Sequence, residues 1–199
     1  MGKRSAKRNY KDSLFRMVFR EKKELLSLYN AINGTMYEDP EELVVTTIED
    51  VLYMGRKNDI SFLIKDVMNL YEHQSSVNPN MPLRGLIYIS MLYQGYIEQN
   101  NLDIYSSTLL KLPTPKYLVF YNGTKAEPDR QELRLSDSFI KREEQPDLEC
   151  RAVVLNINYG HNKDLMEACR KLYEYSRFVE AIRVYLNTGM KLGAAMDQA

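Results

Sequence analysis

Apolar residues recur along this chain with two different periods, and these periods divide it into helices and strands. Apolar positions three and four residues apart predict helices, either one or two short ones over 10–33, one over about 80–100, and more from 161 to 187. Runs rich in β-branched and aromatic residues predict strands at 43–54, 59–64, 68–71, 116–121 and 151–158. The polar stretch 125–149 is expected to be mostly loop, with one short element near 133–139.

The order of these elements predicts an α/β fold. A helix is followed by three strands, a helix, two further strands and terminal helices, which favours a mixed β-sheet (order αβββαβ) flanked by helices. The chain has 199 residues, of which 44% are hydrophobic and 27% charged, as in an ordinary globular domain. We expect a core over 1–160 and a C-terminal helical extension over 161–199 that packs on it.

The strands on either side of Lys65 and Asp66 are predicted to form a hairpin. If the turn has two residues, the numbers of paired residues add up to a constant, so that Ser61 faces Leu70 and Asp59 faces Glu72. Directly opposed residues have Cβ atoms about 4.5–5.5 Å apart. A register shifted by one residue would place the two acids on opposite faces.

Asp59 and Glu72 make the end of this hairpin a candidate catalytic and metal site. Side chains alternate between the faces of a strand, so Gln74 shares the face of Glu72. Two adjacent carboxylates repel each other unless a cation lies between them, and hard oxygen ligands suit Mg²⁺, or Mn²⁺ in its place. The alternative is that both acids are solvated strand ends.

Three further residues could serve this site. Arg84 and Tyr88 lie on one face of the helix that follows the hairpin, where they could bind and position phosphate oxygens. The alternative is a capping arginine and a packing tyrosine. Glu24, in the first helical stretch, could act as an accessory acid or could simply lie on the surface.

The charge distribution is uneven although the net charge is zero. Lys and Arg number 27, as do Asp and Glu, but basic residues dominate from Lys3 to Lys23. This basic segment could contact phosphates, or it could be a solvated tail and helix face.

Several classes of protein are not supported by the sequence. No apolar run is long enough to span a bilayer and the N-terminus lacks the apolar region of a signal peptide, so we expect a cytoplasmic protein without membrane contact. The two cysteines, Cys150 and Cys169, are expected to be reduced and structural. With His73 and His161 as the only histidines, the chain has little material for a zinc site or a Ser/His/Asp triad.

Five segments, taken in order, carry a resemblance to a known family. They are KDSLFRMVF, YMGRKNDISF, NLYEHQSSVNPNMPLRG, LPTPKYLVFYNG and LYEYSRFVEAI. The resemblance extends over most of the chain, which resembles the PD-(D/E)XK nuclease superfamily and, more narrowly, the bacterial recombination-promoting nucleases, also called PD-(D/E)XK nuclease family transposases. The resemblance implies a restriction-endonuclease-like core.

The resemblance also implies roles for individual residues. Asp59 and Glu72 would be metal ligands, together with the main-chain carbonyl of His73. Gln74 occupies the position where most of the superfamily has lysine, so positive charge would have to come from the metal, from Arg84 or from Lys65. The implied activity is Mg²⁺-dependent hydrolysis of phosphodiester bonds in DNA by an endonuclease linked to recombination or mobile elements. Since no third catalytic acid is evident at suitable spacing, we expect cleavage rather than strand transfer.

Two alternatives are compatible with the sequence. The chain could be a catalytically weak or inactive module of the same fold that binds DNA or a protein, because the lysine is missing and the net charge is neutral. A homodimer formed through apolar residues of the last long helix, such as Phe178, Ile182 and Tyr185, is compatible with either function.

Overall fold

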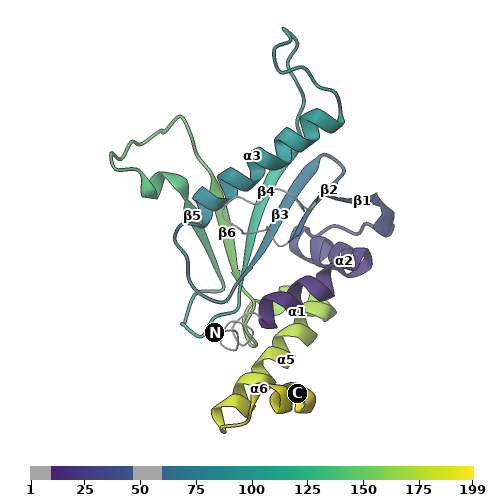
Figure 1. Cartoon of the computed structure of the whole chain (residues 1–199), viewed down its shortest axis with the longest axis vertical. Coiled ribbons are helices and arrows are strands. Elements are labelled where there is room, and N and C mark those ends of the chain that lie inside the picture. The colour runs from purple at the N-terminus through teal and green to yellow at the C-terminus, as the bar shows by residue number, and fades with distance from the viewer. Residues whose placement is uncertain (1–9, 47–59) are drawn as a thin grey trace, which may run out of the picture.

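A computed structural model describes residues 10–46 and 60–199, and its centre is a mixed sheet of six strands (Figure 1). The strands lie in the order β1-β2-β3-β4-β6-β5. Their bounds are β1 Leu43–Val45, β2 Ile60–Ile64, β3 Val67–Gln74, β4 Thr114–Tyr121, β5 Arg130–Arg134 and β6 Arg151–Asn156. Strands β3, β4 and β6 are parallel neighbours, whereas β1, β2 and β5 pair antiparallel with theirs. The predicted mixed α/β fold is therefore confirmed.

The predicted hairpin register is also confirmed for the residues that the structure describes. Ser61 pairs with Leu70 and Ile64 with Val67, on either side of the turn at Lys65 and Asp66. Lys65 has a φ of 51°, the left-handed conformation that a tight hairpin turn requires. The pair Asp59 and Glu72 belongs to the same predicted series, but Asp59 lies outside the described residues.

Helices cover both faces of the sheet. Helix α3 crosses one face, while α1, α2, α4 and α5 pack on the other (Figure 1). The helix bounds are α1 Tyr10–Phe19, α2 Lys22–Asn33, α3 Met81–Gln99, α4 Lys163–Ala168, α5 Arg170–Asn187 and α6 Leu192–Gln198. Among the described helices, none combines the length and the apolarity that crossing a membrane would need.

Each face of the sheet has its own apolar core, and the core under α1 and α2 is rich in aromatic residues. Aromatic rings from α1, β2, β3 and β4 stack beneath α1 and α2, where Phe15 and Phe120 have ring centroids 5.0 Å apart. Three residues of α5, Leu172, Tyr175 and Val179, are buried in this same core. Helix α5 is therefore packed into the domain rather than lying on its surface.

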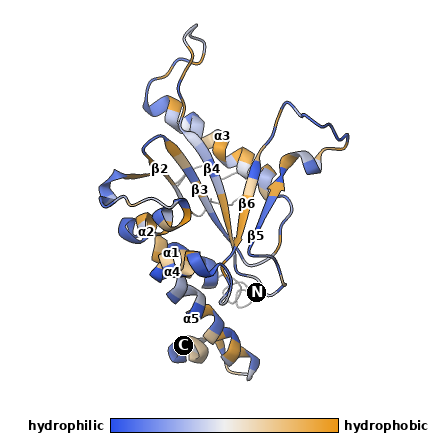
Figure 2. Ribbon diagram, turned by 180° about the vertical axis from the view of Figure 1, so that it is seen from behind, coloured by the Kyte–Doolittle hydropathy of each residue, from blue (hydrophilic) through white to orange (hydrophobic). Residues whose placement is uncertain are grey.

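One strand is not predicted by the sequence pattern. Residues 130–134, RQELR, form β5 at the edge of the sheet, and the short element expected after it proves to be a 3₁₀ turn at Leu135–Ser138. Four of its five residues are charged or polar, and the single apolar one, Leu133, is only half-buried, so the segment shows no strand-like apolar pattern (Figure 2). Charged edge strands of this kind resist pairing with other chains.

Helix α5 offers little of the apolar face that a homodimer would use. Ile182 is 0% exposed and is buried in the interior of the fold, while Phe178 and Tyr185 are half-buried. The homodimer stays a prediction, and Ile182 does not contribute to it.

Candidate functional site

The carboxyl end of β3 carries the candidate site. Side chains alternate along this strand, so Glu72 points to the face covered by α3, as do its apolar neighbours Met68 and Leu70. Gln74 shares that face by the same alternation, and His73 points to the opposite one. Glu72 is only 1% exposed, which is unusual for a carboxylate because burial strongly disfavours its charge.

Arg84 of α3 pairs with this buried acid. Its Nη2 donates to Oε2 of Glu72 at 2.6 Å, and its guanidinium lies 5.9 Å from the ring centre of Tyr88 one turn later. Tyr88 is 6% exposed and packs in the core under α3. The structure thus brings Glu72, Arg84 and Tyr88 together. Arg84 is bonded to the acid, so its guanidinium is not freely available to a substrate.

Gly85 allows α3 to approach the sheet closely at this point. A Cβ atom on Gly85 would lie 2.4 Å from the ring of Tyr117 on β4, a distance that real side chains do not reach. The hydroxyl of Tyr117 faces Glu72, and it lies near the acid without completing a hydrogen bond to it. Glycine at this position therefore allows α3 to pack close enough to the sheet for Arg84 to reach Glu72.

The environment of Glu72 raises the pKa of its carboxyl group to near neutral pH. Burial raises its pKa to about 7 from the usual 4.5, against the opposing influence of Arg84 and Tyr117. The negative charge of Asp12, on α1, raises this pKa further. Asp12 is thus the acid that the described part of the chain brings toward Glu72, and sequence spacing gives no sign of it.

We expect this raised pKa to make the metal-free protein less stable as the pH rises from about 4.5 to 7. The folded state binds more protons than the unfolded state in this window, so the free energy of unfolding falls with increasing pH. The lowered pKa of buried His73, about 3, acts in the opposite direction below pH 6.5.

The difference between wild type and Glu72→Gln isolates this contribution. Urea unfolding in the presence of a chelator should show that the change in the free energy of unfolding from pH 5 to pH 7 is more negative in the wild type than in the variant. An identical pH dependence in the two proteins would mean that Glu72 has an ordinary pKa.

Two buried carboxylate oxygens at this end of the sheet lack partners among the described residues. Oε2 of Glu72 is held by Arg84 and Oδ2 of Asp12 by Arg16, at 3.1 Å, but Oε1 of Glu72 and Oδ1 of Asp12 make no hydrogen bond there. Buried oxygens of this kind suit a hard divalent cation. Within residues 10–46 and 60–199, however, no group of three or more acidic, histidine or cysteine side chains could hold a metal by itself.

The side chain and the backbone carbonyl of His73 point in different directions. Its ring lies on the opposite face, where Nε2 is 2.9 Å from the hydroxyl of Tyr175 in the core. The carbonyl of Gln74 accepts a hydrogen bond from Asn122 on the β4 side, at 2.9 Å. Because successive backbone carbonyls point to opposite edges of a strand, the carbonyl of His73 faces the β2 side.

Two predicted site residues lie elsewhere. Lys65 sits in the hairpin turn, at the other end of β3 and roughly 20 Å from Glu72, where its Nζ pairs with Glu42 at 2.5 Å. Glu24 interacts with Lys171 and Cys169 at the start of α5. Neither residue is brought to Glu72, because α2 and the turn both lie away from the carboxyl end of β3.

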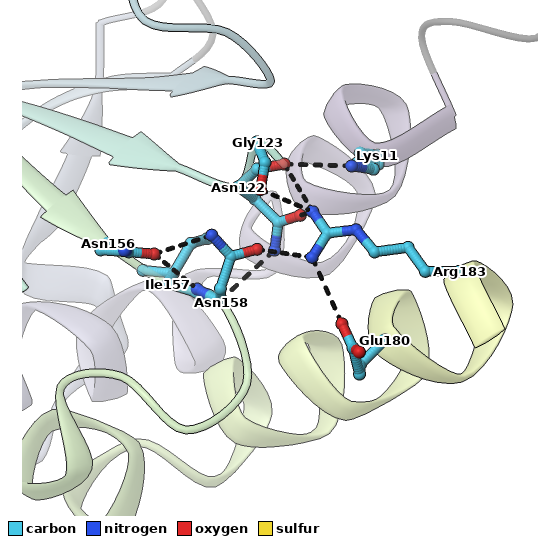
Figure 3. Close-up of polar contacts among 8 residues, drawn as sticks. All are labelled: Lys11, Asn122, Gly123, Asn156, Ile157, Asn158, Glu180 and Arg183. Carbon is cyan, nitrogen blue, oxygen red and sulfur yellow. Dashed lines mark hydrogen bonds and ion pairs between the residues drawn. The ribbon is translucent and has the colours of Figure 1, made fainter. Parts of the chain in front are cut away.

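A second polar cluster occupies the carboxyl ends of β4 and β6 (Figure 3). Arg183 of α5 donates to the carbonyl of Asn122 at 2.9 Å, to the side-chain oxygen of Asn122 at 2.6 Å and to that of Asn158 at 2.6 Å. Lys11 of α1 donates to the same Asn122 carbonyl at 3.0 Å. Burial and the charge of Arg183 lower the pKa of Lys11 to about 8, so Lys11 is still mostly charged at neutral pH.

Comparison with known proteins gives no match. No family model, no curated protein and no solved structure is similar to this chain.

Proposed function

We propose that the chain is a Mg²⁺-dependent DNA endonuclease of the PD-(D/E)XK type. The observation that carries the proposal is the buried Glu72, which has one oxygen held by Arg84 and the other without a partner among the described residues. It lies in a hairpin register that, continued by one pair beyond Ile60 and Tyr71, would set residue 59 opposite it. An acid is present at position 59 in the sequence.

The architecture supports the proposal. An antiparallel hairpin leads through α3 into a parallel strand, and the proposed site lies at the carboxyl end of β3, beside the ends of β4 and β6. Ligands of open α/β sheets commonly bind at the carboxyl ends of parallel strands. This arrangement is compatible with a restriction-endonuclease-like core.

In this proposal, three groups of the chain bind the cation. They are the carboxylates of Asp59 and Glu72 and the main-chain carbonyl of His73, which faces the β2 side. A bound Mg²⁺ would supply a water molecule of lowered pKa and would neutralise charge on the scissile phosphate. The Asp12 carboxylate adds negative potential nearby, which makes the site attractive for a cation.

The remaining residues position these groups. Arg84 holds Oε2 of Glu72, so Oε1 would be the oxygen that holds the cation. Gln74, on the same face, can orient a water molecule through its amide, although it lacks the charge of a lysine. Tyr88 packs beneath Arg84 and fixes its direction.

A plasmid-nicking assay tests the proposal. Purified protein should convert supercoiled plasmid to the nicked form with Mg²⁺ or Mn²⁺ and should not do so with a chelator. Asp59→Ala should abolish nicking and keep the thermal unfolding transition of the wild type. Equal nicking by the variant would refute the assignment.

One observation favours a second function, that of a DNA- or protein-binding module without activity. The pairing of Arg84 with Glu72 already compensates part of the charge that a cation would otherwise neutralise. Salt-dependent DNA binding with no cleavage in Mg²⁺, Mn²⁺ or Co²⁺ would support this alternative.

A further inference from the structure

The cluster at the carboxyl ends of β4 and β6 places two cations close together. The Nζ of Lys11 and the Nη2 of Arg183 donate to one atom, the carbonyl oxygen of Asn122, at 3.0 and 2.9 Å. The two nitrogens are therefore less than about 6 Å apart, since both bonds end on that oxygen. Figure 3 shows the two side chains converging on this carbonyl from α1 and α5.

Most of the groups that bind these cations are neutral. Arg183 bonds to amide and carbonyl oxygens of Asn122, Gly123 and Asn158. The carboxylate drawn with them, Glu180, lies 3.4 Å from the guanidinium and is 43% exposed, so solvent weakens its effect. Lys11 also lies in the first turn of the ten-residue helix α1, where the helix dipole adds positive potential.

The two cations differ in what they can still bind. The two terminal nitrogens of Arg183 are occupied by protein oxygens, which fixes the guanidinium in place. The ammonium of Lys11 has three N–H groups and gives one of them to Asn122, and the side chain is half-buried rather than enclosed. Lys11 can therefore donate to an anion while Arg183 remains fixed beside it.

The cluster lies at the same ends of the strands as the proposed catalytic site, but Lys11 and Arg183 reach it from α1 and α5, on the face opposite α3 and Glu72. Asn122 follows β4 directly, and its N–H donates to the carbonyl of Gln74, two residues after Glu72. Glu72 pairs with Val119, three residues before Asn122, so strand geometry places the Cα atoms of Asn122 and Glu72 roughly 11 Å apart. This separation corresponds to only a few nucleotides along one DNA strand. The basic residues Lys3, Arg4, Lys7 and Arg8 immediately precede α1 in the sequence.

We propose that Lys11 binds a backbone phosphate of DNA a few nucleotides away from the phosphate held at Glu72, with Arg183 as a fixed positive charge that strengthens the contact. This inference rests on the proposed function, because it names DNA as the source of the phosphate. Such a contact contributes to affinity without reading sequence.

Lys11→Gln tests the contact, and Lys116→Gln is the matched control. Lys116 is exposed near the start of β4, at the opposite end of the sheet. Binding of a fluorescent duplex is measured by anisotropy over a range of NaCl concentrations in the presence of a chelator. The slope of log K against log salt should fall in magnitude by about 0.9 for Lys11→Gln and should not change for Lys116→Gln. An unchanged slope in a folded Lys11→Gln protein would overturn the proposal.

Acetylation of the unmodified protein gives a second measurement that does not depend on the folding of a variant. DNA should protect Lys11 from acetylation, read by mass spectrometry, while Lys116 stays equally reactive. Lack of protection at a DNA concentration that saturates binding would also overturn the contact. Plasmid nicking by the wild type is measured separately. If the wild type nicks DNA but Lys11→Gln leaves the salt slope unchanged, only this inference is refuted. If Lys11→Gln lowers the slope but the wild type does not nick DNA, only the proposed nuclease activity is refuted.

Discussion

Glu72→Gln should reduce Mg²⁺-dependent nicking by at least about a hundredfold. The amide keeps the shape of the side chain and can still accept a hydrogen bond from Arg84, but it removes the carboxylate that would bind the cation. Loss of an outer partner of a metal ligand typically costs about 10–100-fold, so the loss of a ligand itself should cost more. Initial nicking rates at saturating Mg²⁺ measure the effect.

Glu24→Gln is the matched control for this experiment. Glu24 is an acid on α2 that interacts with Lys171 and lies away from β3, so its substitution should leave the nicking rate within about twofold. Thermal unfolding confirms that both variants are folded. Nicking by Glu72→Gln at the wild-type rate would mean that the buried acid has a structural role only.

Gly85→Ala should destabilise the protein by about 2–3 kcal/mol and should also reduce nicking. The added Cβ would lie 2.4 Å from the ring of Tyr117, so either the ring or α3 must move. Moving α3 would withdraw Arg84 from Glu72, which lies beside Tyr117. The melting temperature should fall by roughly 5–10 °C.

Gly95→Ala on the same helix separates this clash from the general effect of replacing a helical glycine. A Cβ on Gly95 would meet no atom within 4 Å. Alanine at this position should therefore raise stability by about 0.5–1 kcal/mol. If Gly85→Ala were as stable as Gly95→Ala, the close approach of α3 to β4 would not control the site.

The hairpin and its neighbours could be predicted from the sequence because the relevant signals are local. The alternation of side chains and a two-residue turn determine which residues of β2 and β3 face each other. Arg84 follows the hairpin after a short loop, so its return to Glu72 could also be anticipated. These contacts join residues close together in the chain.

The other features depend on signals that a single sequence does not contain. Strand β5 lies at an edge and has a single apolar residue, Leu133, among four charged or polar ones, and so it resembles a loop in composition. Asp12, Lys11 and Arg183 become neighbours of the strand ends only through the packing of α1 and α5. The sequence allows Lys65 a role at the site, yet the turn that it occupies is directed away from Glu72.

The link from Lys11 through Asn122 to Arg183 has a consequence for synthesis of the protein. Its three members are separated by 111 and 61 residues in the sequence, so the cluster cannot form while α5 is still inside the ribosome. Contacts between residues so far apart in sequence close late in folding. A nascent chain therefore completes its hairpin early and lacks the strand-end cluster until α5 has left the ribosome.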